Sequence, residues 1–357
     1  MTGYLNHFAR FVNSRLVKGR PPNLICYLTS RCQSNCKTCY YHDNLNRTDA
    51  AELTLDEWRK IADKNRFIVN LSLSGGEPFL RDEIAEITLA FAEKNSLHTI
   101  GITSNALLPE TTYVKVKKML EKLPKRTRLE LALSLDGLFE QHDFIRGVPG
   151  NFEKLLETVS RLQAFRKDPR RFVLKTCTVL CRSNIENIGE IIKFAQDGLK
   201  IDRAHIQIPH GKSRIPGELD VDADICERVL RDAADFEIQR QPDFIGKTMA
   251  AFQQRAGEIQ AKIKKGETVF NCRVLDSVAI IAEDGSIYSC EPLRHKVADI
   301  REHDYSLKSA LNSNAAKQFR NEIRTECNCV WYAGVLASLI TDPAELAKIA
   351  LTASRSP

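Results

Sequence analysis

The residues best suited to chemistry are three cysteines that lie close together near the start of the chain. Cys32, Cys36 and Cys39 have the spacing CxxxCxxC, and a Gly-Gly-Glu-Pro run begins further on at Gly75. Three thiolates can hold three irons of a four-iron, four-sulfur cluster, whereas a cluster held by cysteine alone normally takes four. The spacing therefore predicts a cluster with one iron open to a ligand that is not protein. His42 leaves an alternative open, because a Cys₃His set can bind a structural zinc ion.

Regular elements must position these residues, and residues 23 to 210 have a pattern that predicts them. Short apolar runs alternate there with longer helical patterns, which is typical of repeated βα units and a parallel sheet. We expect strands at Leu24 to Leu28, Ile68 to Ser72, Thr99 to Thr103, Leu129 to Ser134, Val173 to Val179 and Ala204 to Ile208. Helices are expected after a capping box at Thr54 to Glu57 and at Asp82 to Lys94, Thr111 to Leu123, Phe152 to Phe165 and Ile185 to Gln196.

The unusual residues all follow the carboxyl ends of these expected strands. In chain order they are the cysteine triplet, Gly75-Gly76-Glu77, Ser104-Asn105, and Ser134 with Asp136 and Gly137. That edge is where βα barrels and open α/β sheets build their sites, so the motifs predict one common site. Glycines there allow close approach of backbone to a ligand, and a glutamate can accept hydrogen bonds from an ammonium group.

A second group of cysteines lies in the C-terminal part of the chain, where the pattern changes. Helices are expected near Asp222 to Phe236 and Thr248 to Lys264, and a β-hairpin from Ser277 to Ser289 that turns at Asp284-Gly285. The cysteines that surround this hairpin are Cys272, Cys290, Cys327 and Cys329. They can supply four ligands to one further cluster or to a structural zinc ion. A final helix is expected at Asp342-Pro343.

Composition agrees with a cytoplasmic enzyme. The chain of 357 residues is 43% hydrophobic, so it can bury a sizeable core. Its net charge of +6 is spread along the chain without the basic stripe that nucleic-acid binding needs. Eleven cysteines without a secretory signal favour metal ligation over disulfides, and no apolar run reaches the length of a membrane span. Residues 4 to 20 are amphipathic, which fits a helix packed on the protein or one at a membrane surface.

The motifs together resemble the radical S-adenosylmethionine (radical SAM) superfamily. The segments that carry the resemblance are Thr29 to Tyr41, Ser74 to Pro78 and Ser134 to Gly137, and the second cysteine group is similar to SPASM or twitch extensions. The resemblance implies an α/β fold, a partial (β/α)6 TIM-type barrel with a small C-terminal α+β auxiliary-cluster domain. The boundaries it suggests are 1–22 for an N-terminal extension, 23–215 for the core, 216–265 for a helical linker, 266–340 for the auxiliary domain and 341–357 for a C-terminal helix.

The resemblance also implies a mechanism. Cys32, Cys36 and Cys39 would hold a cluster whose open iron is chelated by the amino and carboxylate groups of S-adenosylmethionine. Reduction, by an electron donor of the flavodoxin or ferredoxin type, cleaves the sulfonium to methionine and a 5′-deoxyadenosyl radical that abstracts hydrogen. The protein's task is then positioning, water exclusion and electron supply. Cys272, Cys290, Cys327 and Cys329 would hold an auxiliary cluster able to accept a second electron.

Individual cofactor contacts follow from the same resemblance. Tyr40 would flank the adenine, Glu77 would bind the methionyl ammonium, Ser134 and Asp136 would lie near the ribose or carboxylate, and Arg146 would pair with the carboxylate. The remaining residues that would line the cofactor are Gly75, Gly76, Ser104 and Asn105.

Two positions depart from the family pattern, and a few residues near the site have open roles. Gln33 stands where asparagine is common, and Ala106 where glycine is common, so the backbone near the cofactor is expected to differ at Ala106. Cys177, on the fifth strand, is a candidate hydrogen donor inside the barrel. Gln207 and His210, at the end of the sixth strand, are candidates for substrate contact or for structural roles.

The expected reaction is oxidation or rearrangement of a small polar or sugar-like metabolite. The first alternative is a maturase that modifies a peptide or protein side chain. The second is a non-catalytic iron-sulfur or zinc protein that carries electrons or acts as a scaffold.

Overall fold

The structure is a computed structural model that describes residues 18–48, 51–240, 244–267, 272–292, 295–326, 329–340 and 342–355. Most of the amphipathic segment expected at residues 4 to 20 lies outside these ranges. Within them, every helix lacks the combination of length and apolar character that a membrane crossing requires.

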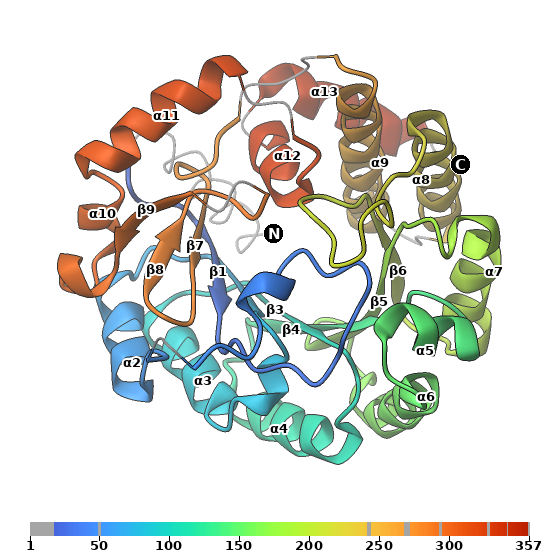
Figure 1. The fold of residues 1–357 in the computed structure, drawn as a ribbon, viewed down its shortest axis with the longest axis horizontal. Helices are drawn as coiled ribbons and strands as arrows, with labels where there is room; N and C mark the ends of the chain where they lie inside the picture. Colours follow the sequence, from blue (N-terminus) through green and yellow to red (C-terminus); the bar gives the residue numbers. More distant parts are fainter. Residues whose placement is uncertain are drawn as a thin grey trace.

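One curved sheet runs through the molecule, with helices around its outside (Figure 1). The strands of the barrel are β1 (Asn23–Tyr27), β2 (Asn70–Ser74), β3 (Thr99–Ser104), β4 (Arg128–Ser134), β5 (Phe172–Val179) and β6 (Arg203–Gln207). They pair in parallel in the order β6-β5-β4-β3-β2-β1, and among the described strands β6 pairs with β5 alone. The predicted partial barrel is therefore confirmed.

The connecting helices cover the outer face of this sheet. They are α2 (Leu55–Lys64), α3 (Ile84–Lys94), α4 (Pro109–Lys122), α5 (Glu140–Arg146), α6 (Asn151–Leu162) and α7 (Ile188–Lys193). The capping box at the start of α2 forms as expected: Thr54 Oγ1 accepts the Glu57 N–H at 3.2 Å and the Glu57 carboxylate accepts the Thr54 N–H at 2.8 Å. Trp58 of α2 and Phe91 of α3 are fully buried against the sheet, which anchors these helices.

Within the barrel, the structure differs from the prediction at three places. The second strand begins at Asn70 and not at Ile68. Ile68 and Val69 are buried, but their N–H groups donate to Asn95 Oδ1 and Pro22 O instead of to a neighbouring strand. The helix expected from Ile185 to Gln196 is divided into a 3₁₀ turn, α7 and a π-helical end at Phe194–Gly198. The short helix α5 follows the fourth strand, where no helix was expected.

The C-terminal part adds three strands to the same sheet. They are β7 (Val278–Ile281), β8 (Ser286–Tyr288) and β9 (Lys296–Asp299), and the order continues β1-β7-β8-β9. The predicted hairpin forms, and its first strand lies parallel to β1. The helices of this part are α8 (Ala223–Arg240), α9 (Phe244–Lys264), α10 (Leu307–Ala310), α11 (Asn314–Glu326), α12 (Tyr332–Leu339) and α13 (Pro343–Arg355). The suggested domain boundaries stay a prediction.

Helix α12 lies across the open side of the barrel, between its two ends (Figure 1). Its first residue, Tyr332, packs on His205 of β6 with 4.8 Å between the ring centroids. At the other end of the barrel, α12 contacts β7. The C-terminal segment thus covers the gap that six parallel strands leave open.

We expect the hairpin and the barrel to unfold together, because β7 is hydrogen-bonded to β1. Ile281→Ala removes a fully buried side chain of β7 and should lower the free energy of unfolding by about 2 to 5 kcal/mol. Chemical denaturation of the apoprotein, followed by circular dichroism, should show one transition that shifts as a whole. The exposed Val114→Ala serves as the control. A separate early transition in Ile281→Ala would contradict this expectation.

Candidate functional site

The loop that carries the three cysteines, residues 28 to 41, has no helix or strand of its own and is fixed first by the segment after β2. The Gly76 N–H donates to Thr29 O and the Glu77 N–H to Arg31 O, both at 2.8 Å. These bonds extend the pairing of β1 with β2 beyond the ends of both strands. They set the direction in which the cysteine loop leaves the sheet.

The two glycines are required by this close approach of two backbones. A Cβ at Gly75 would lie 2.5 Å from Thr29 O, and one at Gly76 would lie 2.3 Å from Arg31 O. Gly75 also has a φ of +123°, which L side chains rarely adopt. The sequence suggested that the glycines give a ligand room. In the structure they line the candidate cavity, and their lack of side chains allows the cysteine loop to pack on them.

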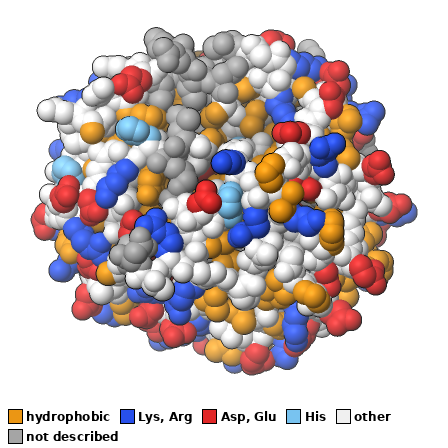
Figure 2. Space-filling view, viewed as in Figure 1, with side chains coloured by type: hydrophobic (Ala, Val, Ile, Leu, Met, Phe, Trp, Pro, Cys, Tyr) orange, Lys and Arg blue, Asp and Glu red, His pale blue; other side chains and the backbone are white. Residues whose placement is uncertain are grey.

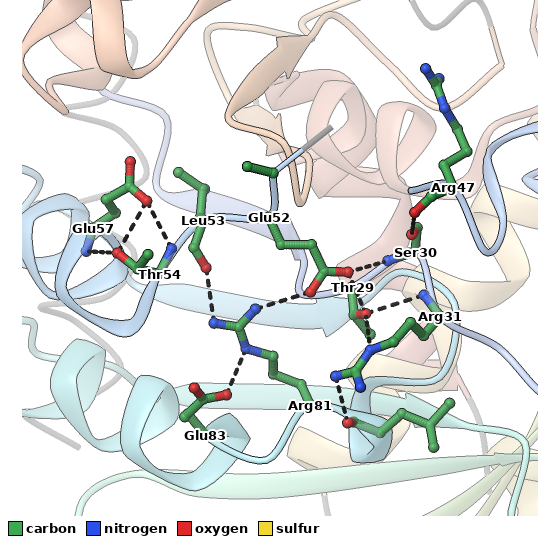
Figure 3. A network of polar contacts seen from close by, with 12 residues as sticks. Thr29, Ser30, Arg31, Arg47, Glu52, Leu53, Thr54, Glu57, Arg81 and Glu83 are labelled. Atoms are coloured by element: carbon green, nitrogen blue, oxygen red, sulfur yellow. Dashed lines mark hydrogen bonds and ion pairs between the residues drawn. The ribbon is translucent and has the colours of Figure 1, made fainter. Parts of the chain in front are cut away.

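A network of polar contacts holds the same stem of the loop from its other side (Figure 3). The Glu52 carboxylate accepts hydrogen bonds from Thr29 Oγ1 at 2.5 Å and from the Ser30 N–H at 3.0 Å. Arg81 pairs with Glu52 at 3.0 Å and with Glu83 at 2.8 Å. Because Arg81 is almost fully buried, its charge needs these carboxylate partners for compensation.

Helix α5 fixes the middle of the cysteine loop. The main-chain N–H groups on both sides of Cys36 donate hydrogen bonds to the last carbonyls of α5. The Asn35 N–H donates to Arg146 O at 3.1 Å, and the Lys37 N–H donates to Ile145 O at 2.9 Å. Gly147 ends the helix at φ +66°, and a Cβ there would lie 2.4 Å from Asn35 O. Glycine is thus needed at this contact between α5 and the loop.

The cysteines and the strand ends surround one cavity of about 240 Å³. Predicted site residues that line it are Cys32, Cys36, Cys39, Tyr40, Gly75, Gly76, Ser104, Asn105, Ser134, Arg146 and Cys177. Gln207, His210 and Glu291 line it as well. The tertiary structure therefore brings residues of the four motifs, each after a different strand, to one place.

The electrostatics of the cavity suit an anionic or electron-rich group. Burial raises the pKa of the Cys36 thiol, and the nearby Arg146 guanidinium opposes this rise. Burial, together with Cys36, raises the pKa of Cys39 to about 12. The Nε of Arg146 is buried without a hydrogen-bond partner in the described part of the chain. Three soft sulfur ligands beside a guanidinium with an unbonded Nε–H fit an iron-sulfur cluster and a carboxylate-bearing cofactor.

Arg146 and Asp136 form a buried ion pair at the edge of the cavity. Arg146 Nη1 lies 3.0 Å from Asp136 Oδ2, and Asp136 Oδ1 accepts the Val179 N–H at 2.8 Å. Asp136 is fully buried and does not line the cavity. Its expected contact with the cofactor stays a prediction, and in the structure it orients Arg146.

Glu77 lies behind the cavity wall rather than in it. Its carboxylate accepts hydrogen bonds from the N–H groups of Phe79 and Asn105, at 3.0 and 2.7 Å, and from Ser104 Oγ at 3.1 Å. It therefore links the loops after β2 and β3. An ammonium contact would add to these partners, and the predicted role stays a prediction.

Ala106 occupies the left-handed region in which glycine is favoured, with φ +62°. The turn is held by the Ala106 N–H, which donates to Ser104 Oγ at 3.1 Å, and by Ala106 O, which accepts from Thr158 Oγ1 at 2.9 Å. These bonds offset the cost of about 1 to 2 kcal/mol that a Cβ brings to this region. The alanine therefore does not require a different backbone conformation at this turn.

His42 has partners that compete with metal ligation. Its Nδ1 is 2.7 Å from Cys39 O and its Nε2 is 3.2 Å from Asp43 Oδ1. Among the described residues, no three His, Cys, Asp or Glu side chains converge on a single ion. A cluster differs from an ion in this respect, because each thiolate binds a different iron. The geometry therefore favours the cluster over the Cys₃His zinc site.

Glu291 is the main residue of the cavity that the sequence did not reveal. Its carboxylate accepts hydrogen bonds from Tyr27 at 2.7 Å and Trp331 at 2.6 Å, and it lies 3.3 Å from His210 Nε2. Tyr27 in turn contacts Tyr40, with 2.9 Å between the hydroxyl oxygens. Burial raises the pKa of the Glu291 carboxyl, but the interactions with His210, Tyr27 and Trp331 lower it by more. The pKa therefore lies below the ordinary value of a glutamate. The one feature of the sequence that could have pointed to Glu291 is its position directly after Cys290.

Cys177 and the hairpin cysteines complete the predicted set. Cys177 Sγ lies 3.6 Å from Gln207 Oε1, and burial raises its pKa to about 12, so it is a thiol at neutral pH. Cys272 and Cys290 are buried and Cys329 is half-buried. Cys327 lies outside the described residues, so the four-cysteine auxiliary site stays a prediction.

Comparison with known families agrees with this geometry. The family model described as the Radical SAM superfamily matches residues 26–195, which include the cysteine loop and strands up to β5. Residues 26–195 are therefore a radical SAM domain. The protein is an enzyme of the class that uses a four-iron, four-sulfur cluster and S-adenosylmethionine, which confirms these two predicted cofactors and disfavours a non-catalytic role.

Relatives of this radical SAM enzyme differ in the substrates that their names imply. The AdoMet-dependent heme synthase of Methanosarcina barkeri is 27% identical over 334 residues, 88% of this chain and 90% of that protein. The PqqA peptide cyclase of Granulibacter bethesdensis is 29% identical over 179 residues, 49% of this chain and 44% of that protein. Streptococcus suis SuiB, solved with its precursor peptide SuiA, has a TM-score of 0.62 at 18% identity, covering 96% of this chain and 77% of that one. This last likeness concerns the fold.

Gly147→Ala should reduce cluster incorporation. Alanine at φ +66° costs about 1 to 2 kcal/mol, and its Cβ also displaces Asn35 and with it the loop at Cys36. Gly150→Ala is the matched control, because Gly150 has φ +76° but open space where a Cβ would be added. After anaerobic reconstitution, iron per chain and the cluster absorbance should fall in Gly147→Ala and stay near wild type in Gly150→Ala. Equal loss in both variants would contradict the role of the contact.

Proposed function

We propose that this radical SAM enzyme oxidises or rearranges a substrate whose reacting group enters the cavity at the carboxyl ends of its strands. The observation that carries the proposal is that one cavity is lined both by the three loop cysteines and by Cys177 and Glu291. When bound, the cluster and S-adenosylmethionine supply a 5′-deoxyadenosyl radical that abstracts hydrogen from a C–H bond.

The residues around the cavity have different roles in the proposed reaction. Cys32, Cys36 and Cys39 hold the cluster, and Arg146, oriented by Asp136, binds the carboxylate of S-adenosylmethionine. The buried wall excludes water, which protects a reactive intermediate from side reactions. The opposite side of the cavity is left for the substrate.

Glu291 is the proton acceptor of the proposed oxidation. Loss of a hydrogen atom to the 5′-deoxyadenosyl radical, followed by loss of an electron to the predicted auxiliary cluster, leaves a substrate that must also release a proton. A carboxylate whose pKa lies below its ordinary value is ionised at neutral pH and can accept that proton. His210, 3.3 Å away, can pass the proton onward.

The polar side chains of the cavity bear on which substrate can react. Gln207 and His210 line it together with Ser134, so a small polar or sugar-like metabolite is the first candidate. A peptide side chain is the second candidate, supported by the likeness to PqqA peptide cyclase and to SuiB with its precursor peptide. The long match to a heme synthase adds the edge of a tetrapyrrole to the substrates that should be tested.

Anaerobic reconstitution tests the radical SAM activity. We expect about eight irons per wild-type chain, and about four when Cys32, Cys36 and Cys39 are all changed to alanine, because the hairpin cysteines keep their cluster. With dithionite and S-adenosylmethionine, the wild type should release 5′-deoxyadenosine and the triple variant should not. A fully iron-loaded wild type that releases none would refute the proposed function.

Glu291→Gln should separate radical formation from product formation. The amide keeps the shape and can still accept from Tyr27, but it cannot take up a proton. We expect 5′-deoxyadenosine to form at a rate near that of wild type, while the product formed from whichever candidate substrate wild type turns over falls by about 10²-fold or more. Glu283→Gln is the matched control, because Glu283 is also buried and bonded to a tyrosine, Tyr41, but lies outside the cavity. Equal product loss in both variants would show a structural effect.

A further inference from the structure

The inner face of the barrel is open below the cavity. Side chains alternate along a strand, so residues two positions before a cavity-lining residue face inward as well. Ser74 and Thr103 line the cavity, which places Ser72 and Gly101 beneath them. Ser72 is exposed and Gly101 is half-buried, although both lie in the middle of the sheet. The interior of a βα barrel is normally filled by bulky side chains, so small residues leave space here.

The part of the inner face formed by β5 and β6 carries cations. Lys175 lies two residues before the cavity-lining Cys177, and it pairs in register with Ala132 on one side and Arg203 on the other. Lys175 and Arg203 are half-buried. Burial and the Lys175 ammonium lower the pKa of His205 to about 4, as expected for side chains that share one space. We use the name pit for the space lined by Ser72, Gly101, Ala132, Lys175 and Arg203.

The pit carries more positive than negative charge. The buried Glu130 forms ion pairs with Lys175 and, at 2.7 Å, with Arg128. Burial raises the pKa of the Glu130 carboxyl, but Lys175, Arg128 and Arg203 lower it by more, to about 2. In the described part of the chain, the ion pairs of Lys175 and Arg128 all run to this one carboxylate. Three cations around one carboxylate leave positive charge that a bound anion would compensate.

We propose that the pit binds the carboxylate of a small acidic substrate through Lys175 and Arg203. The inference rests on the proposed function, because the carbon that loses hydrogen must lie in the cavity above. A strand rises about 3.3 Å per residue, so Lys175 and Cys177 are separated by about 7 Å along β5. A chain of about five carbon atoms spans that distance. The first candidate substrate class is thereby narrowed to carboxylic acids, such as a sugar acid or an amino acid.

The walls above the cations are complementary to the rest of such a substrate. Ser72 and Thr103 carry hydroxyl groups on the inner face, and Gln207 and His210 line the cavity. Figure 2 shows charged and histidine side chains near the middle of the face that Figure 1 views. Hydroxyl and amide groups can bind the alcohol groups of a sugar acid, whereas an apolar substrate would leave them without partners.

Binding of glutarate and glutaramide tests the pit. The two molecules have the same carbon chain, but only glutarate is charged. Isothermal titration calorimetry is done on the reconstituted enzyme with S-adenosylmethionine and without reductant, so that Arg146 is occupied and no turnover occurs. Arg203→Gln should raise the Kd of glutarate about tenfold, because it removes a charged hydrogen-bond donor. Arg166→Gln is the matched control, since Arg166 is also half-buried and paired with a carboxylate, that of Asp202, outside the pit.

Glu130→Gln gives a test that a loss of folding cannot imitate. The amide keeps the shape of the side chain and removes the carboxylate that competes for the same cations, so the Kd of glutarate should fall about tenfold. Iron per chain and circular dichroism are recorded for every variant. An unchanged Kd in Glu130→Gln would overturn the proposal, as would equal binding of glutarate and glutaramide, or a wild type that binds neither. A wild type that releases no 5′-deoxyadenosine with dithionite would instead refute the proposed function, while the titrations decide the pit on their own.

Discussion

The position of an irregular loop is the constraint on which the rest of this structure depends. Cys32, Cys36 and Cys39 can bind one cluster only if the loop has a single conformation, yet its backbone forms no helix or strand. The chain fixes it from outside, through main-chain bonds to the segment after β2 and to the end of α5. Small residues are required at both contacts, since any side chain at Gly76 or Gly147 would collide with the loop backbone.

The second constraint is the opening of the barrel. Six parallel strands do not close, and the C-terminal part of the chain completes the wall by adding β7 to β1 and by laying α12 across the gap. The same segments bring Glu291 to the cavity and Trp331 next to it, where the Trp331 Nε1–H donates to the Glu291 carboxylate at 2.6 Å. The region that carries the second cysteine group therefore also supplies the acid-base chemistry proposed for the first.

Much of the barrel could be predicted, because each strand is an apolar run and each motif follows one. Errors arose where burial and pairing diverge. Ile68 and Val69 are as buried as strand residues, but their N–H groups bond to residues outside the sheet. Helix α5 is too short to show a clear helical pattern of apolar residues. Roles were harder to predict than positions. Glu77 and Asp136 lie beside the cavity, but both are buried and bonded to protein groups that are distant in the sequence.

The sequence by itself determined the cysteine spacing and the order of the six barrel strands, and hence the chemistry that three thiolates with a missing fourth can support. Only the tertiary structure decided which side chains share the cavity. Glu291 and Cys36 are far apart in the chain, and they line the same cavity because β7 pairs with β1. Pairing of this kind depends on long-range burial and hydrogen bonding, which no local pattern of residues records.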